Sequence, residues 1–298
     1  MGVTLSEREG SVQEEAPLSA LTTWRIGGPA RFLCRVRTEG ALARVLAAAA
    51  AEGLPLALLG MGSNILVADE GFPGYVVRLE GDFLEIAIDG ERVRAGGGAA
   101  LGGVCAAAAR AGLSGIEAIS GIPSSIGGAV RINAGAYGGE IFDVLETVRL
   151  VSRSGERRAV EASQIRHGYR NTELVESRDI VSEAVLKLAR APREQIDAKT
   201  RSVAEKRRGA LPSEPNAGSV FKNPRDDYAG RLIEACGLKG RARGAALISP
   251  RHANVIVNTG GARARDVLEL MRAMRDAVAE KFSVTLVPEV ELLGLKWE

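Results

Sequence analysis

Residues 114–140 read SGIEAISGIPSSIGGAVRINAGAYGGE, and our interpretation of the rest of the chain starts from this stretch. Seven of its residues are glycine, and Glu117 is its only charge before Arg131. Because glycine has no Cβ, a backbone rich in it can approach a ligand closely, and successive N–H groups in such turns form anion-binding nests. The composition indicates a cradle for a phosphate or pyrophosphate. Tight turns between strands are an alternative that a glycine cluster satisfies equally well.

A second glycine-rich stretch, residues 59–69, reads LGMGSNILVAD. A short apolar strand leads into its glycines, and a second strand follows from Ile65. The composition is that of a phosphate loop, but the dinucleotide fingerprint GxGxxG would need glycine at position 65, and the loop leads into a strand rather than a helix. The chain also lacks GxxxxGK[ST]. A bound nucleotide would therefore require a fold other than the Rossmann or P-loop folds.

Five motifs occur along the chain in a fixed order, namely GMGSNILV, SGIPSSIGGAVRINAGAYGGE, HGYRNT, NAGSVFKNP and VPEVELLG. Together they resemble the UDP-N-acetylenolpyruvoylglucosamine reductase family, the FAD enzymes of peptidoglycan precursor synthesis. The resemblance extends from about Trp24 to near the C-terminus. Each motif alone is a weak signal, whereas five in order are specific.

The resemblance implies an α+β protein: an FAD-binding fold of the vanillyl-alcohol oxidase type in two subdomains, followed by a C-terminal α+β substrate domain. It implies NADPH-dependent reduction of UDP-N-acetylglucosamine enolpyruvate to UDP-N-acetylmuramate through non-covalently bound FAD. Hydride passes from NADPH to FAD and then to the terminal methylene carbon of the substrate. The neighbouring carbon must then be protonated, so the protein supplies orientation, charge stabilisation and a proton.

Three residues match the catalytic positions that the resemblance implies. Ser219 in NAGSVFKNP is the proton donor, Arg170 in HGYRNT binds the substrate carboxylate, and Glu289 in VPEVELLG shares in proton delivery or polarises the intermediate. Without the resemblance, a turn serine bonded to its own backbone and a surface arginine are the commoner interpretations. Glu291 would share a strand face with Glu289, so simple alternation could also account for a glutamate there.

The resemblance also implies ligand contacts. For Asn133, the alternative to a ligand contact is a structural role as a side-chain cap. The FAD contacts are Gly60, Met61, Gly62, Ser63, Asn64, Ile122, Pro123, Ser124, Ser125, Gly128, Gly135, Ala136 and Tyr137. The UDP-sugar contacts are Lys222, Asn223 and Arg208, with Arg207 as the alternative to Arg208. His252 and Asn254 are expected to have a supporting role.

The chain departs from part of the family in two places. Some members carry an insertion after the YR motif whose tyrosine closes over the diphosphate, but here only a short segment separates Arg170 from the next predicted strand. A lysine precedes the Leu-Pro pair in some relatives, where this chain has Ala210. The chain is therefore similar to the shorter subtype, and what replaces the tyrosine is left open.

Composition excludes several other classes of protein. The 298 residues carry a net charge of +2 and only 4% aromatic side chains, which argues against a nucleic-acid partner. No apolar run approaches the ~20 residues that span a bilayer, and the polar N-terminus is not a signal peptide. We therefore expect a cytoplasmic protein without membrane insertion. The cysteines and the two histidines are too scattered to predict a metal site.

The main rival function is another non-covalent FAD oxidoreductase of the same fold that acts on a sugar or an alcohol. Such an enzyme should lack the serine, arginine and glutamate described above, and it could carry a histidine or cysteine that tethers the flavin. Neither glycine-rich stretch contains a histidine, which favours dissociable FAD. Protein partners and oligomeric state cannot be predicted from the sequence.

Hydrophobic periodicity and turn signals predict mixed helices and strands. We expect a disordered tail over residues 1–17, an FAD-binding domain over 18–191, divided into 18–68 and 69–191, and a substrate-binding domain over 192–298. Helices are predicted over residues 40–52, 101–111, 192–209, 228–236 and 266–282. Strands are predicted over residues 55–59, 65–68, 75–79, 83–88, 92–95, 148–152, 158–161, 180–188, 255–257, 284–287 and 290–293.

Overall fold

The computed structural model describes residues 3–298 and divides them into two compact units, each assembled from several segments of the chain. The first unit contains the segment up to Glu14, Phe32–Met61 and Gly74–Arg207. The second unit contains Glu15–Arg31, Gly62–Pro73 and Arg208–Glu298. Helices of the described residues are α1 (Glu39–Ala51), α2 (Leu101–Arg110), α3 (Ile126–Arg131), α4 (Leu174–Ser177), α5 (Arg193–Ala210), α6 (Ala229–Ala235) and α7 (Ala264–Phe282).

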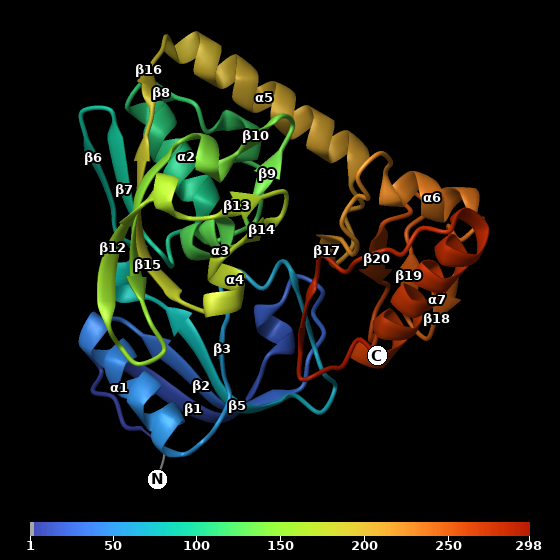
Figure 1. The fold of residues 1–298 in the computed structure, drawn as a ribbon, viewed down its shortest axis with the longest axis horizontal. Helices are drawn as coiled ribbons and strands as arrows, with labels where there is room; N and C mark the ends of the chain where they lie inside the picture. The colour runs from blue at the N-terminus through green and yellow to red at the C-terminus, as the bar shows by residue number, and fades with distance from the viewer. Residues whose placement is uncertain (1–2) are drawn as a thin grey trace. The chain divides into compact units, whose positions relative to one another are not determined.

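A five-stranded antiparallel sheet is the centre of the first unit (Figure 1). Its strands, in spatial order, are β12 (Arg157–Glu161), β11 (Leu145–Val151), β15 (Ile180–Lys187), β7 (Arg92–Gly96) and β6 (Ile86–Asp89). Side chains alternate between the two faces of a strand, and Val93, Ala184 and Leu186 are fully buried on the face that meets α2 and α3. This core supports the glycine-rich stretch from which α3 arises.

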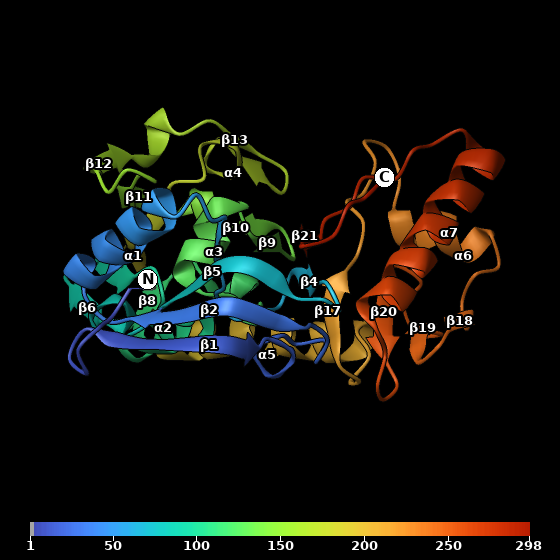
Figure 2. The same cartoon turned by 90° about the horizontal axis from the view of Figure 1, so that it is seen from below.

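The N-terminal region forms a second sheet, in which β1 and β2 run side by side (Figure 2). The order of its strands is β1 (Gly10–Pro17), β2 (Pro29–Val36), β5 (Phe72–Leu79) and β3 (Leu56–Leu58). The prediction of a disordered tail over residues 1–17 is therefore wrong for Gly10–Pro17, and residues 1–2 lie outside the described part of the chain. Most side chains of β1 are exposed, so backbone pairing rather than burial of apolar side chains stabilises this strand. Its polar sequence therefore gives no hydrophobic pattern from which a strand could be predicted.

The second unit packs α6 and α7 with a four-stranded antiparallel sheet. The sheet order is β17 (Asn216–Ser219), β20 (Val255–Asn258), β19 (Ala246–Ile248) and β18 (Ala242–Arg243), and a separate parallel pair joins β4 (Ile65–Val67) to β21 (Glu291–Leu293). The helix predicted over residues 266–282 is confirmed as α7, and Val267, Met271 and Met274 on one of its faces are fully buried. Asp69 supports the start of α7, because its carboxylate accepts hydrogen bonds from the backbone N–H groups of Ala264 (2.8 Å) and Arg265 (3.2 Å).

Trp24 explains why an N-terminal segment belongs to the second unit. Its indole N–H donates to the carbonyl of Ile256 at 2.7 Å, and the Asn258 side-chain amide donates to the Trp24 carbonyl at 2.9 Å. Trp24 and Leu66 are both within the core of this unit. The observed units therefore differ from the contiguous domains predicted over 18–191 and 192–298, and the division at residue 207 falls inside α5.

Most predicted elements are present, with two corrections. Gly81–Leu84 forms a 3-10 helix, so β6 begins later than the predicted strand 83–88. Residues 284–287 do not form a strand, although Leu286 is buried, and the terminal strand is confined to Glu291–Leu293. Their apolar side chains produced the prediction, but in the described structure the pairing is limited to the hydrogen bond from Lys222 to the Val287 carbonyl and to an isolated bridge at Pro288, so no strand forms.

Trp24→Phe is expected to destabilise the protein by about 2–4 kcal/mol, because it removes a buried hydrogen bond and leaves a cavity. The measurement is the unfolding midpoint in urea, followed by far-ultraviolet circular dichroism. Trp297→Phe is the matched control, since Trp297 is only partly buried. Its ring meets Phe221 edge-on at 6.0 Å between centroids and lies 5.0 Å from the Arg275 guanidinium. A midpoint for Trp24→Phe equal to that of the control would contradict the role of the indole.

Candidate functional site

The loop after β3 belongs to the glycine-rich stretch of residues 59–69. Gly62 adopts a φ of +65°, and a Cβ at this position would lie 2.0 Å from the carbonyl oxygen of Leu21, so only glycine fits. Gly60 and Met61 are exposed. Within residues 3–298, the backbone N–H groups of Gly60, Met61 and Gly62 donate no hydrogen bond. The donors of the exposed Gly60 and Met61 are available to an anion.

Asn64 has a structural partner that the sequence did not reveal. Its side-chain amide donates to the carbonyl of Glu289 at 3.0 Å, and its own carbonyl accepts from the N–H of Glu291 at 3.0 Å. The predicted FAD contact at Asn64 thus coincides with a link between the loop and the predicted catalytic strand of the same unit.

The stretch of residues 114–140 contains α3, and Ser125 is the N-cap of this helix. The Ser125 hydroxyl accepts a hydrogen bond from the N–H of Gly128 at 3.2 Å, and the side chain is buried. A Cβ added to Gly60 would lie 2.6 Å from this hydroxyl oxygen, so the two glycine-rich stretches are in close contact here. Ser125 and Gly128, both predicted FAD contacts, therefore bond to one another.

The remaining predicted FAD contacts flank α3 on both sides. The Ser124 carbonyl accepts from the N–H of Leu101 at 2.8 Å, while Ile122 is half-buried and Pro123 is exposed. After α3, the short strands β9 (Gly135–Ala136) and β10 (Gly139–Glu140) pair around a turn. Tyr137 in that turn has a φ of +52° and is 43% exposed, so its ring is available for contact with a ligand.

Arg207, given as the alternative to Arg208 among the predicted UDP-sugar contacts, lies beside the stretch of residues 114–140. The Cδ atom of Arg207 is 2.9 Å from the position of a Cβ added to Gly121. Burial lowers the pKa of the Arg207 guanidinium. Arg208 is exposed, and its carbonyl accepts a hydrogen bond from Arg251 at 2.7 Å. Arg207 and Arg208 are adjacent on α5, so the sequence alone does not show which of them faces the neighbouring stretch.

Arg170 is presented by a very short hairpin in the first unit. It lies between β13 (His167–Gly168) and β14 (Asn171–Thr172) with a φ of +51°. Its guanidinium donates a hydrogen bond to the carbonyl of Gly135 and lies 5.2 Å from the centroid of the Tyr169 ring. The predicted carboxylate-binding arginine is thus anchored to the predicted FAD stretch.

Ser219 and Glu289 come together in the second unit. The N–H of Glu289 donates to the carbonyl of Val220 at 2.9 Å, and the N–H of Lys222 donates to the carbonyl of Val287 at 2.9 Å. An antiparallel bridge therefore holds residues 287–289 beside the segment that follows Ser219. Both Ser219 and Glu289 are partly exposed.

Asn254 supports the segment after Ser219, as expected from the sequence. Its side chain accepts from the N–H of Phe221 at 3.0 Å and donates to the carbonyl of Phe221 at 2.8 Å. Burial lowers the pKa of the neighbouring His252 imidazole, and the charge of Lys239 acts in the same direction. Asn223, a predicted substrate contact, accepts from the N–H of Ala229 at 3.1 Å at the start of α6.

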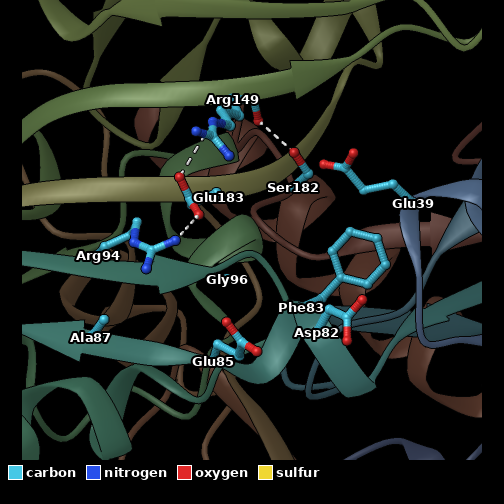
Figure 3. A pocket seen from close by; sticks show the side chains of 10 residues that line it. All are labelled: Glu39, Asp82, Phe83, Glu85, Ala87, Arg94, Gly96, Arg149, Ser182 and Glu183. Atoms are coloured by element: carbon cyan, nitrogen blue, oxygen red, sulfur yellow. Dashed lines mark hydrogen bonds and ion pairs between the residues drawn. The ribbon is translucent and has the colours of Figure 1, made fainter.

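A separate cleft in the first unit, with a volume of about 300 Å³, contains none of the predicted site residues (Figure 3). Glu183 lies between Arg94 at 3.3 Å and Arg149 at 3.4 Å, so opposite charges within the cleft are already paired. The residues that line the cleft are Glu39, Asp82, Phe83, Glu85, Ala87, Arg94, Gly96, Arg149, Ser182 and Glu183. Among residues 3–298, no cluster of His, Cys, Asp or Glu is suited to a metal ion, and no helix has the length and apolarity needed to cross a membrane.

The residues of the first unit fit FAD. The backbone N–H groups in the loop at Gly60 that donate no hydrogen bond suit a phosphate. The exposed Met61 and Tyr137 side chains suit an aromatic ring system. The partly desolvated Arg207 suits an anion. The geometry and the α+β fold therefore indicate a protein that binds a nucleotide cofactor. Residues 30–161 match the sequence model of an FAD binding domain. The class of the protein is thus an FAD-binding protein.

The comparisons are more specific for the rest of the chain. Residues 211–293 match the model described as UDP-N-acetylenolpyruvoylglucosamine reductase, C-terminal domain. The UDP-N-acetylenolpyruvoylglucosamine reductase 2 of Symbiobacterium thermophilum is 44% identical over 96% of this chain and 93% of its own. The corresponding reductase of Bacillus velezensis is 39% identical over 97% of both chains. The chain belongs to the UDP-N-acetylenolpyruvoylglucosamine reductase family.

A solved structure extends this result to the fold. The crystal structure of the UDP-N-acetylenolpyruvylglucosamine reductase from Thermus caldophilus has a TM-score of 0.82 and 41% sequence identity, and the match covers 95% of this chain and 98% of that one. The predicted α+β fold with an FAD-binding domain followed by a C-terminal domain of the reductase is confirmed, as is the predicted family.

Gly60→Ala is expected to weaken FAD binding by about tenfold, equivalent to about 1.4 kcal/mol, because the added methyl group displaces the Ser125 hydroxyl that caps α3. The measurement is the dissociation constant of FAD from flavin fluorescence. Gly40→Ala is the control, since no atom lies within 4 Å of its added Cβ. Ser125→Ala should restore part of the affinity in the double variant, and a double variant weaker than Gly60→Ala would contradict the proposed clash.

Proposed function

We propose that this chain catalyses the NADPH-dependent reduction of UDP-N-acetylglucosamine enolpyruvate to UDP-N-acetylmuramate in peptidoglycan precursor synthesis. The family membership supports this function. The structural observation that carries it is the bridge that places Glu289 beside the strand of Ser219, in the unit whose sequence matches the reductase C-terminal domain. A cytoplasmic location is part of the same proposal.

Bound FAD would accept a hydride from NADPH and supply it to the terminal methylene carbon of the enolpyruvyl group. The residues proposed to hold it are those of the Gly60–Asn64 loop and of the stretch around α3, with backbone N–H groups directed at phosphate oxygens. Because these contacts are not covalent, acid precipitation of the protein should release the flavin.

Ser219 is the proposed proton donor to the carbon next to the substrate carboxylate. A serine hydroxyl is a weak acid, but an enolate carbon is strongly basic, so a well-placed neutral donor can suffice. The hydrogen bond between Gly218 N–H and the Asn216 side chain, at 2.8 Å, fixes the turn immediately before Ser219. This turn would hold the hydroxyl in one place while the proton is transferred.

Arg170 is the proposed partner of the substrate carboxylate. One N–H group donates to Gly135, and a guanidinium has five N–H donors in total. A guanidinium can bind a carboxylate through two parallel hydrogen bonds and stabilise the negative charge that develops as the enolate forms. Glu289 would polarise the same intermediate or share in delivering its proton. Lys222 would meet a phosphate of the UDP-sugar as a point charge.

The competing function, another FAD oxidoreductase acting on a sugar or alcohol, does not require this serine, arginine and glutamate. Anaerobic titration of the reduced protein with the enolpyruvyl UDP-sugar distinguishes the two. Return of the oxidised flavin absorbance in proportion to added substrate is expected. Absence of reoxidation by this substrate would refute the proposal.

Ser219→Ala is expected to leave the rate of flavin reduction by NADPH within about twofold of wild type, and to slow reoxidation by substrate by about 10²–10⁴-fold, the usual contribution of a general acid. Both rates are measured by stopped-flow absorbance. Ser213→Ala, at an exposed serine in the loop before β17, is the control. Unchanged reoxidation in Ser219→Ala would remove Ser219 from the mechanism.

Arg170→Lys is expected to lower kcat/KM for the enolpyruvyl substrate by about 10²-fold, because an ammonium cannot replace the two parallel hydrogen bonds of a guanidinium. Steady-state kinetics with NADPH in excess provide the measurement. Arg166→Lys is the matched control, since Arg166 is exposed and pairs with Glu173 at 3.1 Å. Turnover of Arg170→Lys at the wild-type level would count against the carboxylate-binding role.

A further inference from the structure

The hairpin that carries Arg170 is too short to define its own geometry. Its two strands contribute two residues each, with His167 paired to Thr172 and Gly168 paired to Asn171. Isolated two-stranded ribbons are marginal in water even when they are longer, and Arg170 adds a left-handed backbone conformation at the turn. Contacts from outside the hairpin must therefore determine where the guanidinium lies.

Asn133 provides the first of these contacts, from the FAD stretch. Its side chain is fully buried, and its amide donates to the carbonyl of Gly168 at 3.2 Å. The side-chain oxygen accepts from the N–H of Phe142 at 3.4 Å, and the Phe142 ring stacks on the His167 ring with 4.1 Å between centroids. Both hydrogen-bonding groups of the amide are thus committed to the hairpin or its immediate support.

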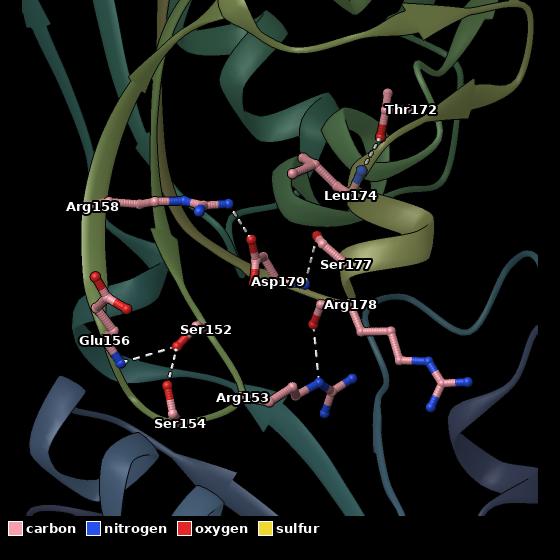
Figure 4. Close-up of polar contacts among 10 residues, drawn as sticks. All are labelled: Ser152, Arg153, Ser154, Glu156, Arg158, Thr172, Leu174, Ser177, Arg178 and Asp179. Atoms are coloured by element: carbon pink, nitrogen blue, oxygen red, sulfur yellow. Dashed lines mark hydrogen bonds and ion pairs between the residues drawn. The ribbon is translucent and has the colours of Figure 1, made fainter.

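Thr172 provides the second contact, from the hairpin back to the FAD stretch. It is 1% exposed, and its hydroxyl donates to the carbonyl of Arg131 at 2.6 Å. The same hydroxyl accepts from the N–H of Leu174 at 3.2 Å (Figure 4). The hydroxyl therefore both donates and accepts within the protein, and it joins three segments: the end of α3, β14 and the start of α4.

The three links follow one another along the FAD stretch. Arg131, Asn133 and Gly135 each bond to the hairpin, through a carbonyl, a side chain and a carbonyl respectively. The last of these bonds is made by the Arg170 guanidinium itself. A displacement of the hairpin would therefore move the guanidinium with respect to the stretch proposed to hold the cofactor.

We propose that Asn133 and Thr172 are positioning residues, which hold the Arg170 guanidinium in a fixed place relative to the FAD stretch. This inference rests on the proposed function of Arg170 as the ligand of the substrate carboxylate. Neither side chain is exposed enough to touch the substrate. Both act through the hairpin backbone.

Thr172→Val and Thr172→Ser form the matched pair that tests the proposal. Valine keeps the shape but removes the hydroxyl, whereas serine keeps both hydrogen bonds. The first readout is the dissociation constant of the enolpyruvyl substrate for the oxidised enzyme, from the change in flavin absorbance. Thr172→Val is expected to raise this constant by about tenfold and Thr172→Ser by less than about threefold, a difference of the size seen when one residue acts through another. The rate of flavin reduction by NADPH should stay within about threefold in both.

A double-variant cycle with Arg170→Lys separates positioning from general damage. If Thr172 acts through Arg170, Thr172→Val adds little to the loss already caused by Arg170→Lys. Ser182→Ala is the control for loss of a buried hydroxyl, since Ser182 donates to the Arg149 carbonyl at 3.2 Å in another part of the same unit. It should leave substrate affinity unchanged. Additive losses in the cycle would overturn the proposal.

Asn133→Gly provides an independent test, because glycine adopts the observed φ of +47° without strain while removing both side-chain bonds. The same loss of substrate affinity and the same non-additivity with Arg170→Lys are expected. Failure of both Thr172→Val and Asn133→Gly to retain FAD would overturn the proposal, since the residues would then support the whole fold. Wild-type affinity in Arg170→Lys alone would instead refute the function proposed for Arg170.

Discussion

The close contact between Gly60 and the hydroxyl of Ser125 is the constraint on which the cofactor site depends. A methyl group at residue 60 would lie 2.6 Å from that oxygen, and the same oxygen caps α3 through Gly128. The loop after β3 and the stretch around α3 thus both contact the hydroxyl oxygen of Ser125. This arrangement leaves the N–H groups of Gly60 and Met61 without protein acceptors in the described structure, and it is why glycine rather than alanine is needed at residue 60.

Side-chain amides perform the corresponding task elsewhere in the chain. Asn64, Asn133, Asn254 and Asn258 each bond to the backbone of a segment distant in sequence. An amide carries both a donor and an acceptor, so it can substitute for a neighbouring strand where the backbone is irregular. Functional loops lack regular partners for their polar backbone groups. Buried asparagines fill this role near both the predicted cofactor stretch and the predicted catalytic strand.

The sequence predicted the elements whose signals are local. The helices predicted over residues 40–52 and 266–282 are present as α1 and α7, because hydrophobic periodicity is a local signal. It failed for β1, whose side chains are mostly exposed, and for the assignment of Trp24 to the second unit, which depends on a bond to Ile256 far along the chain. Resemblance to a family located the motifs, but local pattern could not reveal which segments pack together.

The site predictions are limited for the same reason, since a local pattern does not show which groups bond to distant parts of the protein. A motif identifies residues that a fold requires, without distinguishing those that touch a ligand from those that hold the loop. Ser125 and Asn64 were both predicted as FAD contacts, yet each is committed to a protein partner. Arg207 was only an alternative to Arg208, yet it is the arginine whose guanidinium is desolvated beside Gly121. A group with its hydrogen bonds saturated by protein is suited to positioning, whereas a desolvated cation or an undonated N–H is suited to binding. By this criterion Thr172 and Asn133 belong to the first class, and Gly60, Met61 and Arg207 belong to the second.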